Sequence, residues 1–483
     1  MKKTFSTGFI FCFFLAAFSM NASAQEYKYD LNKYFTPDIV RNRLDLNFNS
    51  RGDFGNNTSQ PTTPGNPKDS TSSSNMNGNI QSTFQTTRNT RKHITDFYLV
   101  GYLSGNTSTN NDNRDQTYAK NTGNNVSEGI NPNYSSTIYN LKNQFIRFGG
   151  SMNLYNYIET NNNNYKLYKI KSNYDQRNFS ANASIAIGVG RIEQVEDARQ
   201  AIYILEALST KGLLTRHLTE EEIFNLSQQV SRVKNKRFLD SRLHLIDEIT
   251  SIDSFFVSNN LLNKQDATYF TTLNDLWQNG ANFARRSGHV FMISLMPLMN
   301  IDYSKNQTTY FMPDSIFWYK SNLNNKGANL TISYNYEKAV NLNWQHSVEV
   351  TLLGSTYLYN QSNSNSLYQG VSPRKSNQSL LNLTGKYSIG YYPSTRTYLT
   401  ASITQNVISS YYKYYDSTMF DSKPWQKQFS SNTELNLSAY YYISSQLRLS
   451  GSAGLRNYYS EYLDYRNNML SGSFTANLSY SFF

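Results

Sequence analysis

Residues 342–352 have the sequence "LNWQHSVEVTL", in which apolar and polar side chains alternate without a break. A period of two predicts a β-strand with one apolar and one polar face. The same alternation recurs at 328–336, 435–441 and 447–455. Most alternating runs are 10 to 16 residues long, whereas strands of soluble proteins average about five or six. This length suits a tilted strand that crosses a bilayer.

Composition agrees with a membrane-spanning β-protein. Of the 483 residues only 38% are hydrophobic, yet 39 are tyrosines. The tyrosines cluster near the ends of the alternating runs, at 391–392, 411–412, 440–442 and 458–459, which is typical of the two interfaces of a membrane. The longest mainly apolar run after residue 24, "VFMISLMPLM" at 290–299, is shorter than the ~18 residues that a transmembrane helix needs.

The first 24 residues predict export. Lys2 and Lys3 precede an apolar run at 9–18, and Ala-Ser-Ala at 22–24 is typical of a signal-peptidase site. Cys12 is the only cysteine, so the mature chain is expected to lack disulfides and thiolate metal sites.

The segment 474–483, "FTANLSYSFF", predicts a final strand that ends in an aromatic residue. Phe474, Leu478 and Phe482 share one register, and Phe483 falls one residue out of phase. In these features the chain resembles the outer-membrane β-barrel proteins of Gram-negative bacteria. The resemblance is architectural and names no function. It implies an all-β transmembrane barrel in an outer membrane.

Fourteen strands are predicted, with twelve as the alternative if 79–104 is irregular. Bacterial barrels have even strand numbers, short periplasmic turns and longer outer loops. Residues 165–190 are divided in two, because one strand of that length is too long for a single crossing. The strands are expected at 40–50, 79–88, 92–104, 144–159, 165–173, 178–190, 288–303, 327–337, 341–357, 377–392, 396–411, 429–442, 446–460 and 469–482.

A helical insertion is predicted at 191–286, between barrel strands 1–6 (25–190) and 7–14 (287–483). Four segments in it repeat apolar residues every three or four positions. Thr219 and Glu222 have the spacing of a capping box at the start of the second helix. Counting strands back from a periplasmic C-terminus places the insertion on the periplasmic side, where it replaces a turn.

Charge is uneven along the chain. The formal net charge is +11, but residues 191–286 hold 12 Lys and Arg against 13 Asp and Glu, so the excess lies in the strand segments. It suits contact with anionic lipopolysaccharide or an anion-attracting lumen. The predicted lumen-facing polar residues are Arg43, Asp45, Arg147, Glu349, Lys386, Glu434, Arg448 and Arg456. Both signs occur, so many are expected to pair.

No catalytic, cofactor or metal site is predicted. The five histidines are His93 and His289 at strand starts, His217 and His244 in the insertion, and His346 on the lipid-facing register near mid-membrane. None has a partner set typical of an outer-membrane hydrolase or a metal site. Nucleic-acid binding is disfavoured by location and by the lack of a basic motif.

Charged residues also crowd the junction between strand and helix. The acidic members are expected to complement a helix N-terminus, and the arginines to pair at the barrel rim. A docking face for a periplasmic protein or cell-wall polymer is the other interpretation. These residues are Arg191, Glu193, Glu196, Asp197 and Arg199.

Two classes of function follow. The first is a porin-like pore or substrate channel, gated by the periplasmic helical domain. The second is a structural or assembly protein, whose barrel anchors a partner-binding helical domain.

Overall fold

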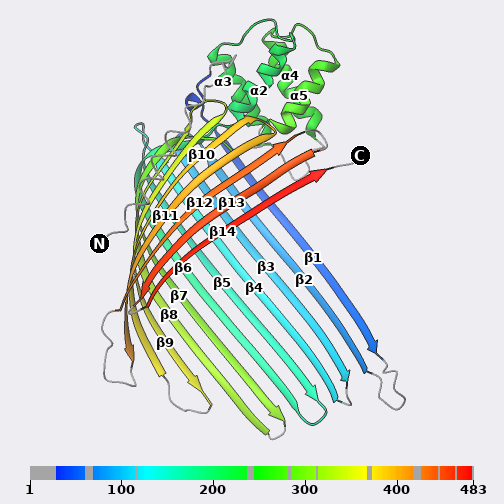
Figure 1. Ribbon diagram of the computed structural model, residues 1–483, viewed down its shortest axis with the longest axis vertical. Coiled ribbons are helices and arrows are strands. Elements are labelled where there is room, and N and C mark those ends of the chain that lie inside the picture. The colour runs from blue at the N-terminus through cyan, green and yellow to red at the C-terminus, as the bar shows by residue number, and fades with distance from the viewer. Residues whose placement is uncertain are drawn as a thin grey trace. The chain divides into compact units, whose positions relative to one another are not determined.

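The computed structural model places fourteen strands in one sheet, among the residues that it describes, and four α-helices between the sixth and seventh strands (Figure 1). The strands follow one another in sequence order, and every neighbouring pair is antiparallel. The predicted fold class is confirmed in its strand number, its antiparallel order and its helical insertion. The structure describes residues 29–59, 69–114, 117–236, 244–280, 284–311, 314–366, 372–416, 426–443, 447–462 and 465–480. The signal-peptide prediction and Phe482–Phe483 lie outside these residues.

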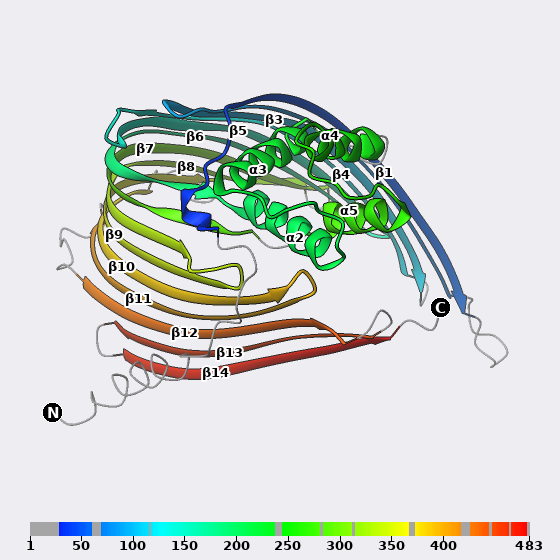
Figure 2. The same cartoon turned by 90° about the horizontal axis from the view of Figure 1, so that it is seen from above.

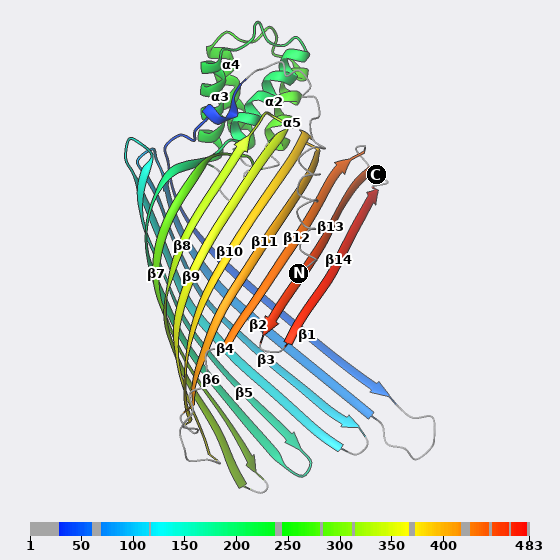
Figure 3. The same cartoon turned by 60° about the vertical axis from the view of Figure 1, so that its left-hand side comes forward.

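The strands are 16 to 26 residues long. They are β1 (Ile39–Ser59), β2 (Asp69–Asn89), β3 (His93–Arg114), β4 (Thr117–Tyr139), β5 (Gln144–Tyr165), β6 (Lys169–Gln194), β7 (Arg286–Phe311), β8 (Asp314–Ala339), β9 (Trp344–Asn365), β10 (Ser372–Ser394), β11 (Thr397–Asp416), β12 (Gln426–Tyr442), β13 (Leu447–Tyr462) and β14 (Tyr465–Tyr480). Figure 3 shows them side by side in this order.

The strand register gathers the apolar residues onto one face. Leu352 of β9 lies opposite Ile332 of β8 and Leu383 of β10. The row continues to Ile293 in β7 and Val407 in β11. Because side chains alternate along each strand, the residues between them form a second, mainly polar face. The alternation that predicted the strands therefore also sorts the faces of the whole sheet.

Two strand predictions were wrong, and their effects on the count cancel. The segments predicted at 165–173 and 178–190 are one strand, β6. The predicted connection at 105–143 contains β4, whose sequence from Thr117 to Asn125 is polar on both faces. The predicted turn at 160–164 lies inside β5. Strands that continue beyond the apolar band lose their alternation there, so their outer ends carried no period-two signal.

The sheet curves from β1 at one edge to β14 at the other (Figure 2). Within the described residues, β1 pairs only with β2 and β14 only with β13. No helix among the described residues is both long enough and apolar enough to span a membrane.

The helical insertion was predicted to begin at residue 191, but the first helix begins at Glu196. β6 continues to Gln194, and its last residues pair with the start of β7, with Arg191 opposite His289. Gly190 and Gly288 make this possible, since their φ angles are +99° and +120°. A Cβ at either position would lie within 2.1 Å of the carbonyl oxygen on the other strand. Only glycine fits such positions without strain.

The four helices form a separate compact unit. They are α2 (Glu196–Thr210), α3 (Glu220–Lys234), α4 (Leu245–Ser258) and α5 (Ala267–Asn279). Helix α2 packs against α3 and α5, and α4 contacts the same two helices. The predicted apolar positions form their core, including Ile202, Leu205, Leu226, Ile252 and Leu273, all fully buried.

An N-terminal segment completes this helical core. Residues 29–34, here called the strap, belong to the helical unit, although only four residues separate them from the start of β1 in the chain. Leu31 and Tyr34 of the strap are buried, and the Tyr34 ring contacts Phe224 of α3. Lys33 pairs with Glu220 at 2.7 Å. The strap was not predicted to belong to the helical unit.

The predicted capping box is present in α3. The Thr219 side chain accepts from the Glu222 backbone, and the Glu222 carboxylate accepts from the Thr219 backbone at 2.8 Å. Bonds from Arg216, then from the Thr219 backbone, lower the pKa of Glu222 to about 2. The insertion joins β6 to β7 at the same end of the sheet as the turns at 90–92 and 140–143. Its location on the periplasmic side stays a prediction.

The folded state lowers the pKa of Glu222. The capping box therefore makes its full contribution to the stability of the helical unit at pH values above the unfolded pKa, near 4.5. This contribution is lost as the pH falls from about 4.5 towards 2. We expect Glu222→Gln to lower the helical unit's free energy of unfolding by about 1 kcal/mol at pH 7, and by less at pH 3. Amide exchange of α3 at both pH values measures this. An equal effect at both would contradict the titration.

Candidate functional site

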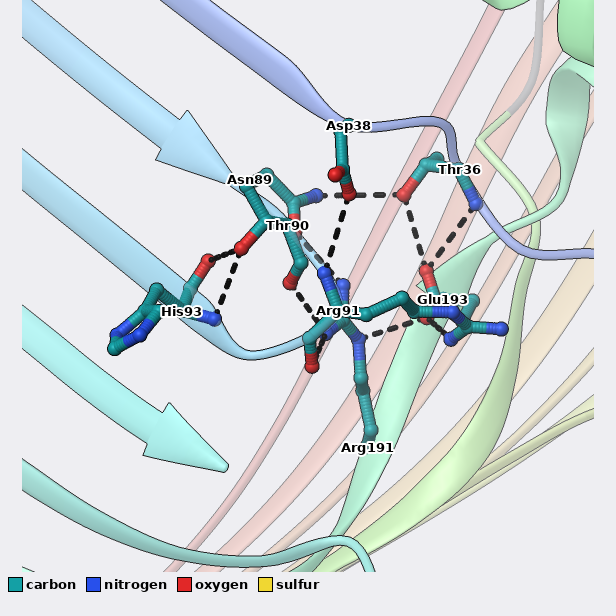
Figure 4. A network of polar contacts seen from close by, with 8 residues as sticks. All are labelled: Thr36, Asp38, Asn89, Thr90, Arg91, His93, Arg191 and Glu193. Atoms are coloured by element: carbon teal, nitrogen blue, oxygen red, sulfur yellow. Dashed lines mark hydrogen bonds and ion pairs between the residues drawn. The ribbon is translucent and has the colours of Figure 1, made fainter. Parts of the chain in front are cut away.

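The chain leaves the sheet for the helical unit through a group of charged residues. Glu193, near the end of β6, forms an ion pair with Arg191 at 2.7 Å and another with Arg91 at 3.0 Å. Arg91 lies in the turn between β2 and β3. Figure 4 shows both guanidinium groups directed towards the Glu193 carboxylate. The side chains of Arg191 and Glu193 are only 6% and 12% exposed, so this is a largely desolvated ion-pair network.

Backbone and amide groups complete this network. Arg191 also donates to the Thr90 carbonyl at 2.9 Å and to the Asn89 side-chain oxygen at 2.8 Å. On the other side, Thr36 donates its hydroxyl to Glu193 at 3.1 Å. Partial burial lowers the pKa of the Arg91 guanidinium, an effect opposed by the nearby Glu193 charge. The network therefore fastens the end of β6 to the β2–β3 turn and to the residues before β1 (Figure 4).

The chain returns to the sheet through Arg285, which the sequence analysis missed. This side chain is fully buried just before β7. It donates to the carbonyls of Leu342, Asn341 and Trp344 at 2.6, 2.7 and 2.8 Å. It also donates to the Gln345 side chain at 3.0 Å. Arginine alone offers five donors in a planar fork, so this one side chain fixes the β8–β9 turn.

The two connections are also bonded to each other. The Val195 amide donates to the Arg285 carbonyl at 2.8 Å, and Val195 is fully buried. One residue separates β6 from α2, and six separate α5 from β7. The exit and return of the insertion are thus held by two arginine-centred sites. Buried polar groups of this kind specify one arrangement when all of them are satisfied.

The predicted junction residues divide into two groups. Arg191 and Glu193 belong to the strand network. Asp197 instead pairs with Lys234 of α3 at 2.6 Å and also accepts from Ser231. Glu196 and Asp197 occupy the first turn of α2, as expected for acidic residues near a helix N-terminus.

Arg199, the fifth junction residue, lies in the helical core rather than at the rim. It is fully buried, with its guanidinium 5.1 Å from the Tyr203 ring centre. Its place on the apolar-facing side of α2 was not foreseen. A docking role for the junction residues stays a prediction.

The predicted lumen residues all fall on the polar face of the register. Opposite charges meet there: Arg43 pairs with Asp45 at 2.6 Å, and Arg456 with Glu434 at 3.4 Å. Their pairing was expected. Their position in a lumen stays a prediction.

The remaining four predicted lumen residues have different contacts. Glu349 lies opposite Lys386 in the β9–β10 register. Arg147 donates to the Thr137 hydroxyl at 2.9 Å. Arg448 lies 5.8 Å from the Tyr440 ring centre. Together they leave the polar face with both signs of charge along most of the sheet.

No group of three metal-ligating His, Cys, Asp or Glu side chains occurs in the described part of the chain. His346 lies at the third position of β9, near the short-turn end of the strand, and not near mid-strand as expected. Its Nδ1 is 2.7 Å from the Tyr387 hydroxyl. Both His346 and Tyr387 lie on the apolar register, and this hydrogen bond involves no carboxylate.

Comparisons with known proteins yield only distant structural similarity. No protein-family model matches the chain, and no curated protein does. The translocator domain of the autotransporter NalP from Neisseria meningitidis matches at 10% identity and a TM-score of 0.22, over 82% of this chain and 90% of that one. The transport unit of the autotransporter AIDA-I from Escherichia coli matches at 10% identity and a TM-score of 0.21, over 98% and 97%.

The ferric yersiniabactin uptake receptor FyuA from Yersinia pestis matches at 8% identity and a TM-score of 0.28, over 89% of this chain and 62% of that one. Scores this low carry no argument about what this chain does. Its function has to be inferred from its own residues.

Proposed function

We propose that this protein is a non-enzymatic outer-membrane pore or substrate channel, whose helical unit controls access from the periplasm. The fastening of the helical unit's connections carries this proposal. The exit is held by the Arg191–Glu193 ion pair, and the return by Arg285. Short connections restrict the distance that a domain can move from the chain segments that hold it, which suits a regulatory role.

The polar face of the sheet supports a hydrated path. A fourteen-strand barrel encloses a lumen between those of filled eight-strand and open sixteen-strand barrels. Paired charges such as Arg456–Glu434 lie along that face. Such a wall favours water and polar solutes over lipid. The outer membrane of a Gram-negative cell, with its lipopolysaccharide, is the location in which this fold would act.

The strap gives the helical unit a third connection. Only four residues separate Tyr34, which is buried in the helical core, from the start of β1. The unit is thus joined to β1, β6 and β7 by short segments of chain. Three short connections restrict movement more than the two that a simple insertion has, which suits a regulatory element with few positions.

An anchor function is the second candidate, because the helical unit has a complete core of its own. In this alternative the barrel holds the unit at the membrane, and the helices bind a periplasmic protein or cell-wall polymer. The two functions differ in whether the barrel conducts ions.

Single-channel recording in planar bilayers distinguishes them. We expect the full chain to conduct, and a variant with Gly-Ser linkers in place of 196–282 and 29–34 to conduct several-fold more. Both segments are replaced because each would expose apolar core residues without the other. The control is Lys264→Ala, an exposed change in the helical unit, which should leave conductance unchanged.

Folding of the deletion variant is checked by its heat-dependent migration in gels. A folded deletion variant with the conductance of the full chain would contradict gating and favour the anchor. If neither protein conducts, the channel itself is contradicted.

A further inference from the structure

The outer ends of β1 to β5 extend beyond any apolar band. These strands have 21 to 23 residues, whereas about 9–11 suffice to cross a bilayer. Their outer thirds consist mostly of Asn, Ser, Thr and Gly on both faces. Segments that are polar on both faces belong in water, so this part of the sheet is available to a soluble ligand.

The outer ends contain a groove of about 470 Å³. Its polar-face residues form two adjacent rows across five strands. One row is Asp53, Asn75, Ser108, Gly123 and Asn161, and the other is Gly55, Ser73, Asn110, Asn121 and Asn163. Strands about 4.8 Å apart thus present a regular array of short amide and hydroxyl side chains.

Glycine keeps the groove open. At Gly123 a Cβ would lie 2.7 Å from the Asn161 side-chain oxygen and 3.0 Å from the Ser108 hydroxyl. A side chain at residue 123 would therefore displace these two groups. The absence of one leaves room beside two hydrogen-bonding groups.

Some hydrogen-bonding capacity in the groove is unused. The side-chain oxygens of Asn75 and Asn121 are covered, and no donor among the described residues reaches either. A covered amide oxygen without a donor is costly. A small side-chain rotation towards a hydroxyl ligand in the groove would satisfy it.

The charge of the groove selects against ions. Among the described residues that line it there is no Lys, Arg or His, and the one acid, Asp53, pairs with Arg51 at 2.9 Å. An anionic ligand would therefore have no cationic partner among these residues, and an apolar ligand would contact polar amide side chains. The single aromatic, Phe54, lies on the opposite register. Recognition therefore relies on hydrogen bonds to many donors and acceptors.

We propose that this groove, on the outer parts of β1 to β5, binds a neutral oligosaccharide. Sugar hydroxyls both donate and accept, which matches an array of amides and hydroxyls. The elongated two-row form suits several linked sugar units rather than one. This inference does not depend on channel activity, because a silent barrel could display the same site.

The test is isothermal titration of the detergent-solubilised full chain with four neutral hexasaccharides: maltohexaose, cellohexaose, mannohexaose and chitohexaose. Hexagalacturonate is the anionic probe. We expect at least one neutral sugar to bind and hexagalacturonate not to bind. Asn121→Leu and Asn163→Leu should each weaken binding about five-fold or more, the size of effect when a hydrogen bond is replaced by an unsatisfied contact.

The matched control is Asn162→Leu, because residue 162 lies between two groove asparagines but on the opposite register. It should leave affinity unchanged, and Gly123→Ala should reduce it by filling the groove. Heat-dependent gel migration confirms that each variant folds. Binding by none of the neutral sugars, equal binding of hexagalacturonate, or equal loss from Asn162→Leu would each overturn the proposal.

Discussion

Replacing Arg285 with alanine is expected to lower the free energy of unfolding of the strand unit by about 4 kcal/mol. The change removes the hydrogen bonds that Arg285 donates to the carbonyls of Asn341, Leu342 and Trp344. It also leaves a cavity beneath Tyr392, which lies 5.1 Å from the guanidinium. Reversible urea unfolding in lipid vesicles measures the effect.

Two further variants distinguish the effect of the planar guanidinium geometry on stability from the effect of its charge. Arg285→Lys keeps the charge but cannot reach four acceptors at once, so most of the loss should remain. Arg216→Ala removes an arginine that is 48% exposed and ion-paired to Glu222, and should cost less than about 1 kcal/mol. An Arg285→Lys variant as stable as the wild type would contradict the fork argument.

Removing the strap's apolar side chains should unfold much of the helical unit. We expect the double variant Leu31→Ala, Tyr34→Ala to lose roughly 5 kcal/mol, because each large-to-small core change costs about 2–5 kcal/mol. Tyr34 also loses a 2.6 Å hydrogen bond to the Ser231 hydroxyl. A domain's whole stability is only about 5–15 kcal/mol, so amide exchange in α2 to α5 should accelerate by orders of magnitude.

Lys33→Ala is the matched control within the same segment. Its side chain is 57% exposed and pairs with an equally exposed Glu220, so exchange rates should hardly change. Unaltered protection of α3 in the double variant would mean that the four helices are stable without the strap. That outcome would support the helical segment as a domain that folds alone.

The sequence predicted the apolar band of the sheet well, because lipid imposes a strict period of two on every crossing. Runs such as 342–352 mark strands in the band. Outside the band, both faces meet water and the alternation vanishes. For that reason β6 was divided at "SNYDQR", residues 172–177. β4 was missed because its outer half is polar and because Glu128 and Pro132 interrupt the apolar register of its other half. The correct total of fourteen came from two opposite errors.

The helical unit was predictable where local chemistry decides the structure. The Thr219–Glu222 capping box and the buried face of α2 need only neighbouring residues. Arg285 and the strap were not predictable in this way. Their partners lie 57 and 197 positions away in the chain, and nothing in one sequence indicates contacts at that separation.

The candidate site was foreseen in part. Arg191 and Glu193 were recognised because charges crowd the junction. Their partner Arg91 lies in a turn about 100 residues earlier, where a lone arginine gives no signal. The two glycines with positive φ were likewise visible only once the strands were paired, since each is required by the backbone of the opposite strand.

The strap also gives the chain a closed loop. By joining Tyr34 to α3, it closes the intervening chain, which contains β1 to β6, into a loop. The entropy cost of closing a loop rises slowly with its length, and the helical core can compensate it before the chain beyond α5 takes part. β1 to β6 thus lie within a chain segment whose two ends meet in the helical unit, whereas β7 to β14 lie outside it. A cut in the chain anywhere between the strap and α3 would open this loop, whereas a cut beyond α5 would leave it closed.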